Sequence, residues 1–143
     1  MAYYPDLSSY SYDAGARGTL NVGWLSREHA YTTGVTPEGL VEALAGLARH
    51  AVNVQRGMHF CDLCPDFRTA RERTSRGDLF LGSGEIHVPN GRGLTYASPA
   101  MIVHYVEDHS YLPPEDYRKA VRDRWGALRG HPGYSAGTSR TPP

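Results

Sequence analysis

The feature that most constrains this chain is a pair of cysteines, Cys61 and Cys64, separated by a spacer of 39 residues from a pair of histidines, His104 and His109. The chain has 2 cysteines in all, and both belong to this pattern. Two thiolates at this spacing can hold a soft metal ion from one tight turn, and two histidines roughly three to five residues apart can complete a tetrahedron. The pattern therefore predicts a Cys2His2 site with Zn2+ as the cofactor.

The spacing of the two histidines limits where they can lie on a helix. Residues five apart on an ideal helix differ by about 140° around its axis, because each turn takes about 3.6 residues. His109 must therefore lie where the helix loosens or ends, and the approach to Pro113 and Pro114 supplies a reason for that. The nearby acids Asp62, Glu107 and Asp108 are expected to contact the ligand imidazoles.

Other interpretations of these residues stay open. A close cysteine pair can be a redox pair, although this one does not open a helix inside a βαβ unit, and two helical histidines can simply be hydrogen-bonded. His59, two residues before Cys61, could be a ligand, a hydrogen-bond partner of one, or a base beside the metal. Glu85 could point at the metal from its strand. His59 and Glu85 are therefore the candidate catalytic residues if the site is catalytic.

The hydrophobic pattern predicts an α+β fold, in which short antiparallel strands and hairpins pack against about three helices. Thr36-Pro37 and Ser98-Pro99 each offer a hydroxyl cap followed by proline, which is typical of a helix start. A third helix is expected from Pro113-Pro114, and residues 65–77 fit a short helix or a loop equally well. Strands are expected at 19–25, 52–54, 78–81, 85–88 and 94–96, with a hairpin turn at Asn90-Gly91.

The order of these segments is that of a zinc-finger-like ββα element with a large insert: a cysteine turn, then a hairpin, then a helix that carries the histidines. We expect a Tyr-rich N-terminal arm at 1–17, a single zinc-binding domain at 18–128, and a disordered tail at 129–143, where Gly, Pro, Ser and Thr dominate.

Composition excludes several classes of function. The formal net charge is zero and the pI is about 7.1, which argues against a general nucleic-acid binder. No apolar run is long enough for a membrane span, and the N-terminal residues lack the pattern of a signal peptide. We therefore expect a cytoplasmic protein, in which a close cysteine pair more often binds metal than forms a disulfide. The motifs H-E-x-x-H, G-x-S-x-G, G-x-G-x-x-G and the P-loop are absent.

Several segments resemble a family of small, uncharacterised bacterial proteins that is common in actinobacteria. The main one is 96–117, which contains HYV-x2-H-x-Y-x-PPE from His104 to Glu115, and 57–64, 82–89, 4–8 and 20–25 fit the same family. The resemblance covers roughly residues 3–121. It implies that the two cysteines and two histidines belong to one compact domain, and it implies no activity.

Three functions compete. Four protein ligands leave zinc no open position, which favours a binding or regulatory protein with a structural zinc and a protein partner. The alternative is a zinc-dependent enzyme, hydrolase-like or lyase-like, with three protein ligands, a zinc-bound water, and His59 or Glu85 as the proton carrier. A nucleic-acid-binding zinc finger is less favoured, because the helix that carries the histidines is apolar and acidic.

Overall fold

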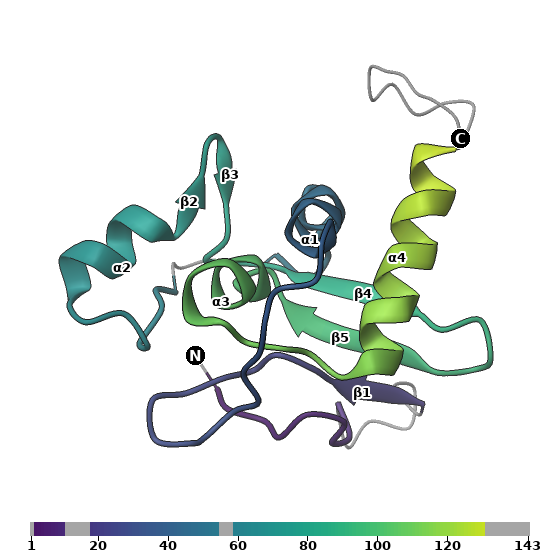
Figure 1. Cartoon of the computed structure of the whole chain (residues 1–143), viewed down its shortest axis with the longest axis horizontal. Helices are drawn as coiled ribbons and strands as arrows, with labels where there is room; N and C mark the ends of the chain where they lie inside the picture. Colours follow the sequence, from purple (N-terminus) through teal and green to yellow (C-terminus); the bar gives the residue numbers. More distant parts are fainter. Residues whose placement is uncertain (1, 11–17, 55–58, 131–143) are drawn as a thin grey trace.

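The computed structural model of the chain describes residues 2–10, 18–54 and 59–130. These residues form an α+β architecture of four helices, a mixed three-stranded sheet and a two-stranded hairpin (Figure 1). The elements in chain order are β1 (Thr19–Asn21), α1 (Leu40–Ala48), α2 (Phe67–Arg73), β2 (Ser75–Arg76), β3 (Leu79–Phe80), β4 (Glu85–Pro89), β5 (Thr95–Pro99), α3 (Ile102–His109) and α4 (Glu115–Arg129). The segment 11–17 of the expected arm and residues 131–143 of the expected tail lie outside the described residues.

The sheet has the strand order β1-β5-β4, and its two pairings run in opposite senses. β4 and β5 are antiparallel, with Pro89 opposite Thr95 and the predicted turn at Asn90-Gly91 between them. The Asn90 side chain accepts hydrogen bonds from the backbone N–H groups of Arg92 (2.7 Å) and Leu94 (3.1 Å), which fixes the turn. β1 pairs with β5 in parallel, so the prediction of antiparallel strands is correct for β4–β5 and β2–β3 and wrong for β1. Alternation of apolar and polar residues indicates a strand, but it does not show whether the strand pairs in a parallel or an antiparallel sense.

The first helix begins later than predicted. α1 starts at Leu40, after Gly39 in the left-handed region (φ 82°), and not at Thr36. The Thr36 hydroxyl instead donates to the backbone oxygen of Val106 in α3, at 3.4 Å. The predicted cap is therefore used for a tertiary contact that the local sequence does not reveal.

α3 also begins later than predicted, because its expected cap residue bonds to another element, whereas α4 begins where it was predicted. Ser98 and Pro99 end β5, and α3 begins at Ile102. The buried Ser98 hydroxyl donates to the hydroxyl of Tyr117 at 2.9 Å, which joins β5 to α4. α4 begins directly after Pro114. The remaining helix, α2, lies in the segment 65–77, which fitted a short helix or a loop equally well.

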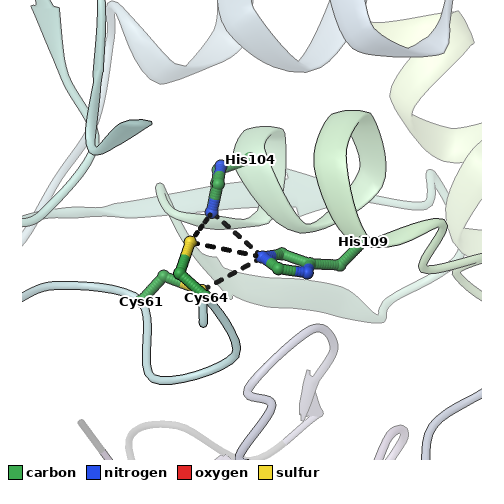
Figure 2. Close-up of side chains that lie close together, drawn as sticks. All are labelled: Cys61, Cys64, His104 and His109. Carbon is green, nitrogen blue, oxygen red and sulfur yellow. Dashed lines mark hydrogen bonds between the residues drawn. The ribbon is translucent and has the colours of Figure 1, made fainter. Parts of the chain in front are cut away.

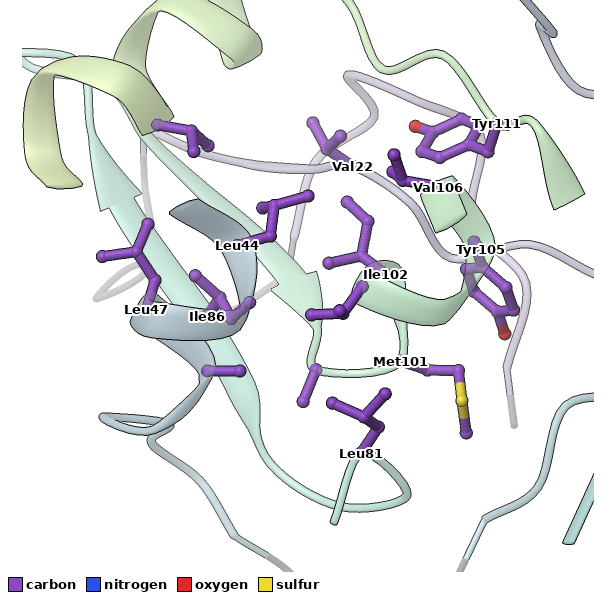
Figure 3. Close-up of a cluster of buried hydrophobic side chains, with 14 of the residues drawn as sticks. Val22, Leu44, Leu47, Leu81, Ile86, Met101, Ile102, Tyr105, Val106 and Tyr111 are labelled. Atoms are coloured by element: carbon purple, nitrogen blue, oxygen red, sulfur yellow. The ribbon is translucent and has the colours of Figure 1, made fainter. Parts of the chain in front are cut away.

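The hydrophobic core lies where α1 packs against α3, α4 and β4 (Figure 3). Val22, Leu44 and Ile102 are fully buried there, and each such side chain stabilises the fold by about 1.5–3 kcal/mol. α1 and α4 pack closely because Gly46 faces the Trp125 ring: a Cβ on Gly46 would lie 2.2 Å from that ring. This core holds the body of α3 in place. α2 and the β2–β3 hairpin lie at the opposite end of the molecule from α4 (Figure 1).

The described N-terminal residues, 2–10, run along the segment that contains β1. Single bridges join Tyr4 to Trp24 and Ser9 to Leu20. The Asp6 carboxylate accepts hydrogen bonds from the Gly23 N–H (2.9 Å) and from the Tyr111 hydroxyl (2.7 Å). Asp6 thereby ties this segment to the chain that follows α3. No helix in the described part of the chain is both long and apolar enough to cross a membrane.

Candidate metal centre

Two sulfur and two nitrogen atoms from distant parts of the chain converge beside α3 (Figure 2). All four donor atoms lie within 4.8 Å of one another. Nε2 of His104 is 3.3 Å from Sγ of Cys64 and 3.2 Å from Nε2 of His109. Nε2 of His109 is 3.4 Å from Sγ of Cys61. The structure therefore brings together the predicted residues into a group that could hold a metal ion, called the Cys2His2 group below (Cys61, Cys64, His104 and His109).

Backbone contacts shape the loop 61–64 that presents the two sulfurs. The Leu63 N–H donates to Sγ of Cys61 at 3.3 Å, which folds the loop around that sulfur. The Arg27 side chain donates to the backbone oxygens of Asp62 (2.6 Å) and Cys64 (2.7 Å). Arg27 therefore fixes the loop against the segment that follows β1. Both cysteine side chains are buried.

The end of α3 explains how two histidines five residues apart can meet. His109 is the last residue of the helix, as predicted, and Ser110 adopts the left-handed region with φ 56°. The N–H group of Tyr111 donates to the backbone oxygen of Tyr105, six residues earlier, at 3.2 Å. A turn closed by this bond is wider than an α-helical turn, in which the N–H group bonds to the fourth preceding residue. This wide turn removes the angular offset and points both imidazoles to one side.

Asp108 orients one of the imidazoles. Its Oδ2 lies 2.8 Å from Nδ1 of the buried His104, although the two atoms are not aligned as a full hydrogen bond. Its Oδ1 lies 3.1 Å from the guanidinium of Arg73 in α2. A carboxylate beside Nδ1 favours the tautomer in which Nε2 is free to bind metal. Glu107 instead pairs with Arg76, and the Asp62 carboxylate lies 3.4 Å from the Arg27 backbone nitrogen.

Burial sets the protonation of the group. It raises the pKa of Cys61 to about 12 and also raises the pKa of Cys64. It lowers the pKa values of His104 and His109. Without a cation the four side chains are therefore neutral near pH 7. A neutral imidazole is the form that binds metal, and a bound divalent cation would reverse the preference of the thiols by stabilising their thiolates.

The two candidate catalytic residues are not part of the Cys2His2 group. His59 and Glu85 instead both line a separate pocket of about 360 Å³. Oε1 of Glu85 accepts hydrogen bonds from the Tyr10 hydroxyl and the His87 ring, both at 2.8 Å. Burial alone would raise the pKa of Glu85, but these hydrogen bonds outweigh it and hold the pKa below its usual value. A catalytic role for either residue stays a prediction.

Sequence reasoning missed the residues that support the group from a distance. Arg27 lies 35 positions from Asp62, whose carbonyl it contacts, and Arg73 comes from a separate helix. Arginines are frequent on any surface, so neither carries a recognisable pattern. The cysteines and histidines could be found because their residue types are rare and their spacing is specific.

Comparison with known proteins identifies the family and no function. Residues 2–122 match the model of a domain of unknown function, DUF7919, and the chain belongs to this family. Neither a search of curated proteins nor a search of solved structures finds a match.

Proposed function

We propose that this DUF7919 protein is a small zinc-binding domain in which the Cys2His2 group holds a structural Zn2+, and that it acts as a binding or regulatory protein. The separations of the donor atoms carry the proposal. A tetrahedral zinc ion with ordinary bond lengths places sulfur and nitrogen donors about 3.5 Å apart and two nitrogen donors about 3.3 Å apart. Three of the four sulfur–nitrogen separations in the group are 3.3, 3.4 and 3.6 Å, the nitrogen–nitrogen separation is 3.2 Å, and all donor atoms lie within 4.8 Å of one another.

The choice of zinc follows from the donor set. Two thiolates and two imidazoles in a tetrahedron suit Zn2+ better than the oxygen-seeking ions Mg2+ and Ca2+. A site with four protein donors has no open position for a water or a substrate, which is the arrangement of structural zinc sites. The ion would then join the loop 61–64 to the end of α3, and its binding energy would contribute to folding.

The structural interpretation is favoured over a zinc enzyme because all four donors already converge and three of them are buried. Catalysis would require one donor to leave and a solvent molecule to replace it. A nucleic-acid role is disfavoured by the zero net charge and by Glu107 and Asp108 on the helix that carries the histidines. The class of protein partner stays a prediction.

The proposal is tested by counting metal ions and their ligands. Protein purified without a chelator should contain about one zinc per chain, and its X-ray absorption spectrum should fit two sulfur and two nitrogen neighbours. Replacement with Co2+ should give the visible absorption of tetrahedral thiolate coordination. His109→Ala should lose this spectrum, while His50→Ala, which changes an exposed histidine outside the group, should keep it.

Two results would change the proposal in different ways. Protein with only traces of any transition metal would contradict a metal centre. Three protein donors and one solvent oxygen at the zinc would support the zinc-enzyme alternative and contradict the structural role.

A further inference from the structure

The pocket of about 360 Å³ that contains Glu85 is built separately from the metal centre. It lies where β4 begins and β5 ends, and the Gly82–Ser83–Gly84 turn forms part of its wall. Its volume falls at the lower end of the range for small-molecule sites, which is about 300–1,000 Å³. The pocket is therefore large enough for a ligand of about the size of an amino acid or an aromatic amine.

Glu85 supplies a charged group to this pocket. Its side chain is only 12% exposed, yet every hydrogen bond to its carboxylate from the described residues ends on one oxygen, Oε1. The donors are Tyr10, His87 and Asn53. The second oxygen, Oε2, has no such partner among the described residues, and it is not completely buried. An accessible carboxylate oxygen on a side chain that is otherwise largely buried is free to accept a hydrogen bond, and a ligand that donates one would satisfy it.

Three aromatic side chains line the pocket together with Glu85 and His59. The rings of Tyr4 and Trp24 meet edge to face, with centroids 5.5 Å apart, and Tyr10 holds Glu85 from another side. The Trp24 indole N–H donates to the Ala97 backbone oxygen at 2.9 Å, which fixes that ring. Aromatic faces attract cations, and a carboxylate beside them adds direct charge attraction.

We propose that this pocket binds a small molecule that carries a protonated amine next to an apolar group. The amine would donate to the free oxygen of Glu85, and the apolar group would contact the rings of Tyr4 and Trp24. The chemistry of the lining favours a cation over an anion, because Glu85 is the acidic residue among the described residues that line the pocket and no arginine or lysine is among them. This inference does not rest on the zinc centre.

The test is an NMR titration of the full zinc-loaded chain with three probes of the same size and different charge: phenethylammonium, 2-phenylethanol and phenylacetate. We expect phenethylammonium to bind saturably below about 10 mM and to shift the signals of the Trp24 indole and of the Gly82 and Gly84 amides. The neutral alcohol should bind at least about tenfold more weakly, and the anion more weakly still.

Variants separate the pocket from general charge effects. Glu85→Gln should remove the preference for the ammonium probe, while Glu42→Gln, which neutralises an exposed carboxylate of α1, should leave it unchanged. Tyr4→Leu, at a residue that is 38% exposed, should weaken binding of the ammonium probe and keeps the test valid if Glu85→Gln does not fold.

The proposal is overturned if no probe binds saturably, if the three probes bind alike, or if the shifts map away from the pocket. Zinc content is measured in every sample. A failure of amine binding with zinc present is thereby distinguished from a failure of the metal centre.

Discussion

Removal of the metal should destabilise the fold without abolishing it. The core between α1, α3, α4 and β4 is built from Val22, Leu44, Ile102 and their neighbours, and the loop 61–64 adds only Cys61 and Cys64 to this buried cluster. Without zinc, the loop 61–64 would lose its link to His104 and His109. The hydrogen bonds from Arg27 remain. We therefore expect an apo state that keeps the core and loosens at the loop and at the end of α3.

The magnitude follows from mass action. A ligand that binds only the folded state at about 1,000 times its dissociation constant stabilises it by about 4.1 kcal/mol. For a chain of this size, 1 kcal/mol shifts Tm by about 2–4 °C, so the apo protein should melt roughly 8–16 °C below the zinc-loaded protein. Hydrogen exchange should increase most at the loop 61–64 and near His109.

The assay is differential scanning calorimetry of zinc-loaded, chelated and reconstituted protein, with metal content measured in each sample. His109→Ala should melt near the temperature of the apo protein and should lose most of the response to added zinc. His50→Ala should respond like the unaltered chain. Equal melting of zinc-loaded and verified metal-free protein would refute the reasoning, and so would a full zinc response in His109→Ala.

Three further predictions concern single side chains. Gly46→Ala should lower the free energy of unfolding by about 1–2 kcal/mol, because the new Cβ would meet the Trp125 ring. Gly126→Ala has no atom within 4 Å of its Cβ position and should raise the free energy of unfolding by up to about 1 kcal/mol. Urea unfolding measures both changes, and equal effects would contradict the packing argument. Arg27→Ala should weaken zinc affinity by about 10–100-fold in a chelator competition, because its hydrogen bonds to the loop are lost. Arg68→Ala, on the exposed face of α2, should leave the zinc affinity unchanged. Unchanged affinity in Arg27→Ala would show that the loop does not need this side chain. Burial, followed by the hydrogen bond to Glu85, raises the pKa of Tyr10 from 10.0 to about 12, so its contribution to stability is complete below pH 10 and is lost as the pH rises through about 12. Tyr10→Phe should therefore lose less stability than the unaltered chain between about pH 10 and about pH 12 in urea unfolding, and an identical loss would contradict this assignment.

The residues of the Cys2His2 group were the most predictable part of the molecule. A metal ligand is defined by its donor atom, so the residue type and the spacing of Cys61 and Cys64 contain most of the information. The same holds for the prediction that His109 ends its helix, because it follows from helix geometry alone. The acid that contacts His104 was predicted only as one of three, since Asp62, Glu107 and Asp108 all lie within two positions of a residue of the group.

Contacts between distant segments could not be predicted in the same way. The hydroxyls of Thr36 and Ser98 fit the pattern of a helix cap, but each bonds to another element, and the helices begin at Leu40 and Ile102 instead. The parallel pairing of β1 with β5 joins strands separated by about half of the chain. Such choices depend on which partner is within reach after folding, and local sequence carries little of that information.

The spacing of the two histidines shows why the helix end and the metal centre depend on each other. A second ligand four residues after His104 would lie on the same helix face without any distortion, but Asp108 occupies that position and contacts Nδ1 of His104. The second histidine stands one residue later, at His109, which can reach the Cys2His2 group only because the last turn is wide and Ser110 takes the left-handed region. One turn of helix therefore supplies both the second histidine of the group and the carboxylate beside the first. Because a left-handed serine is an uncommon conformation that the surrounding contacts must hold, a metal bound to His109 would stabilise the turn that makes its own binding possible.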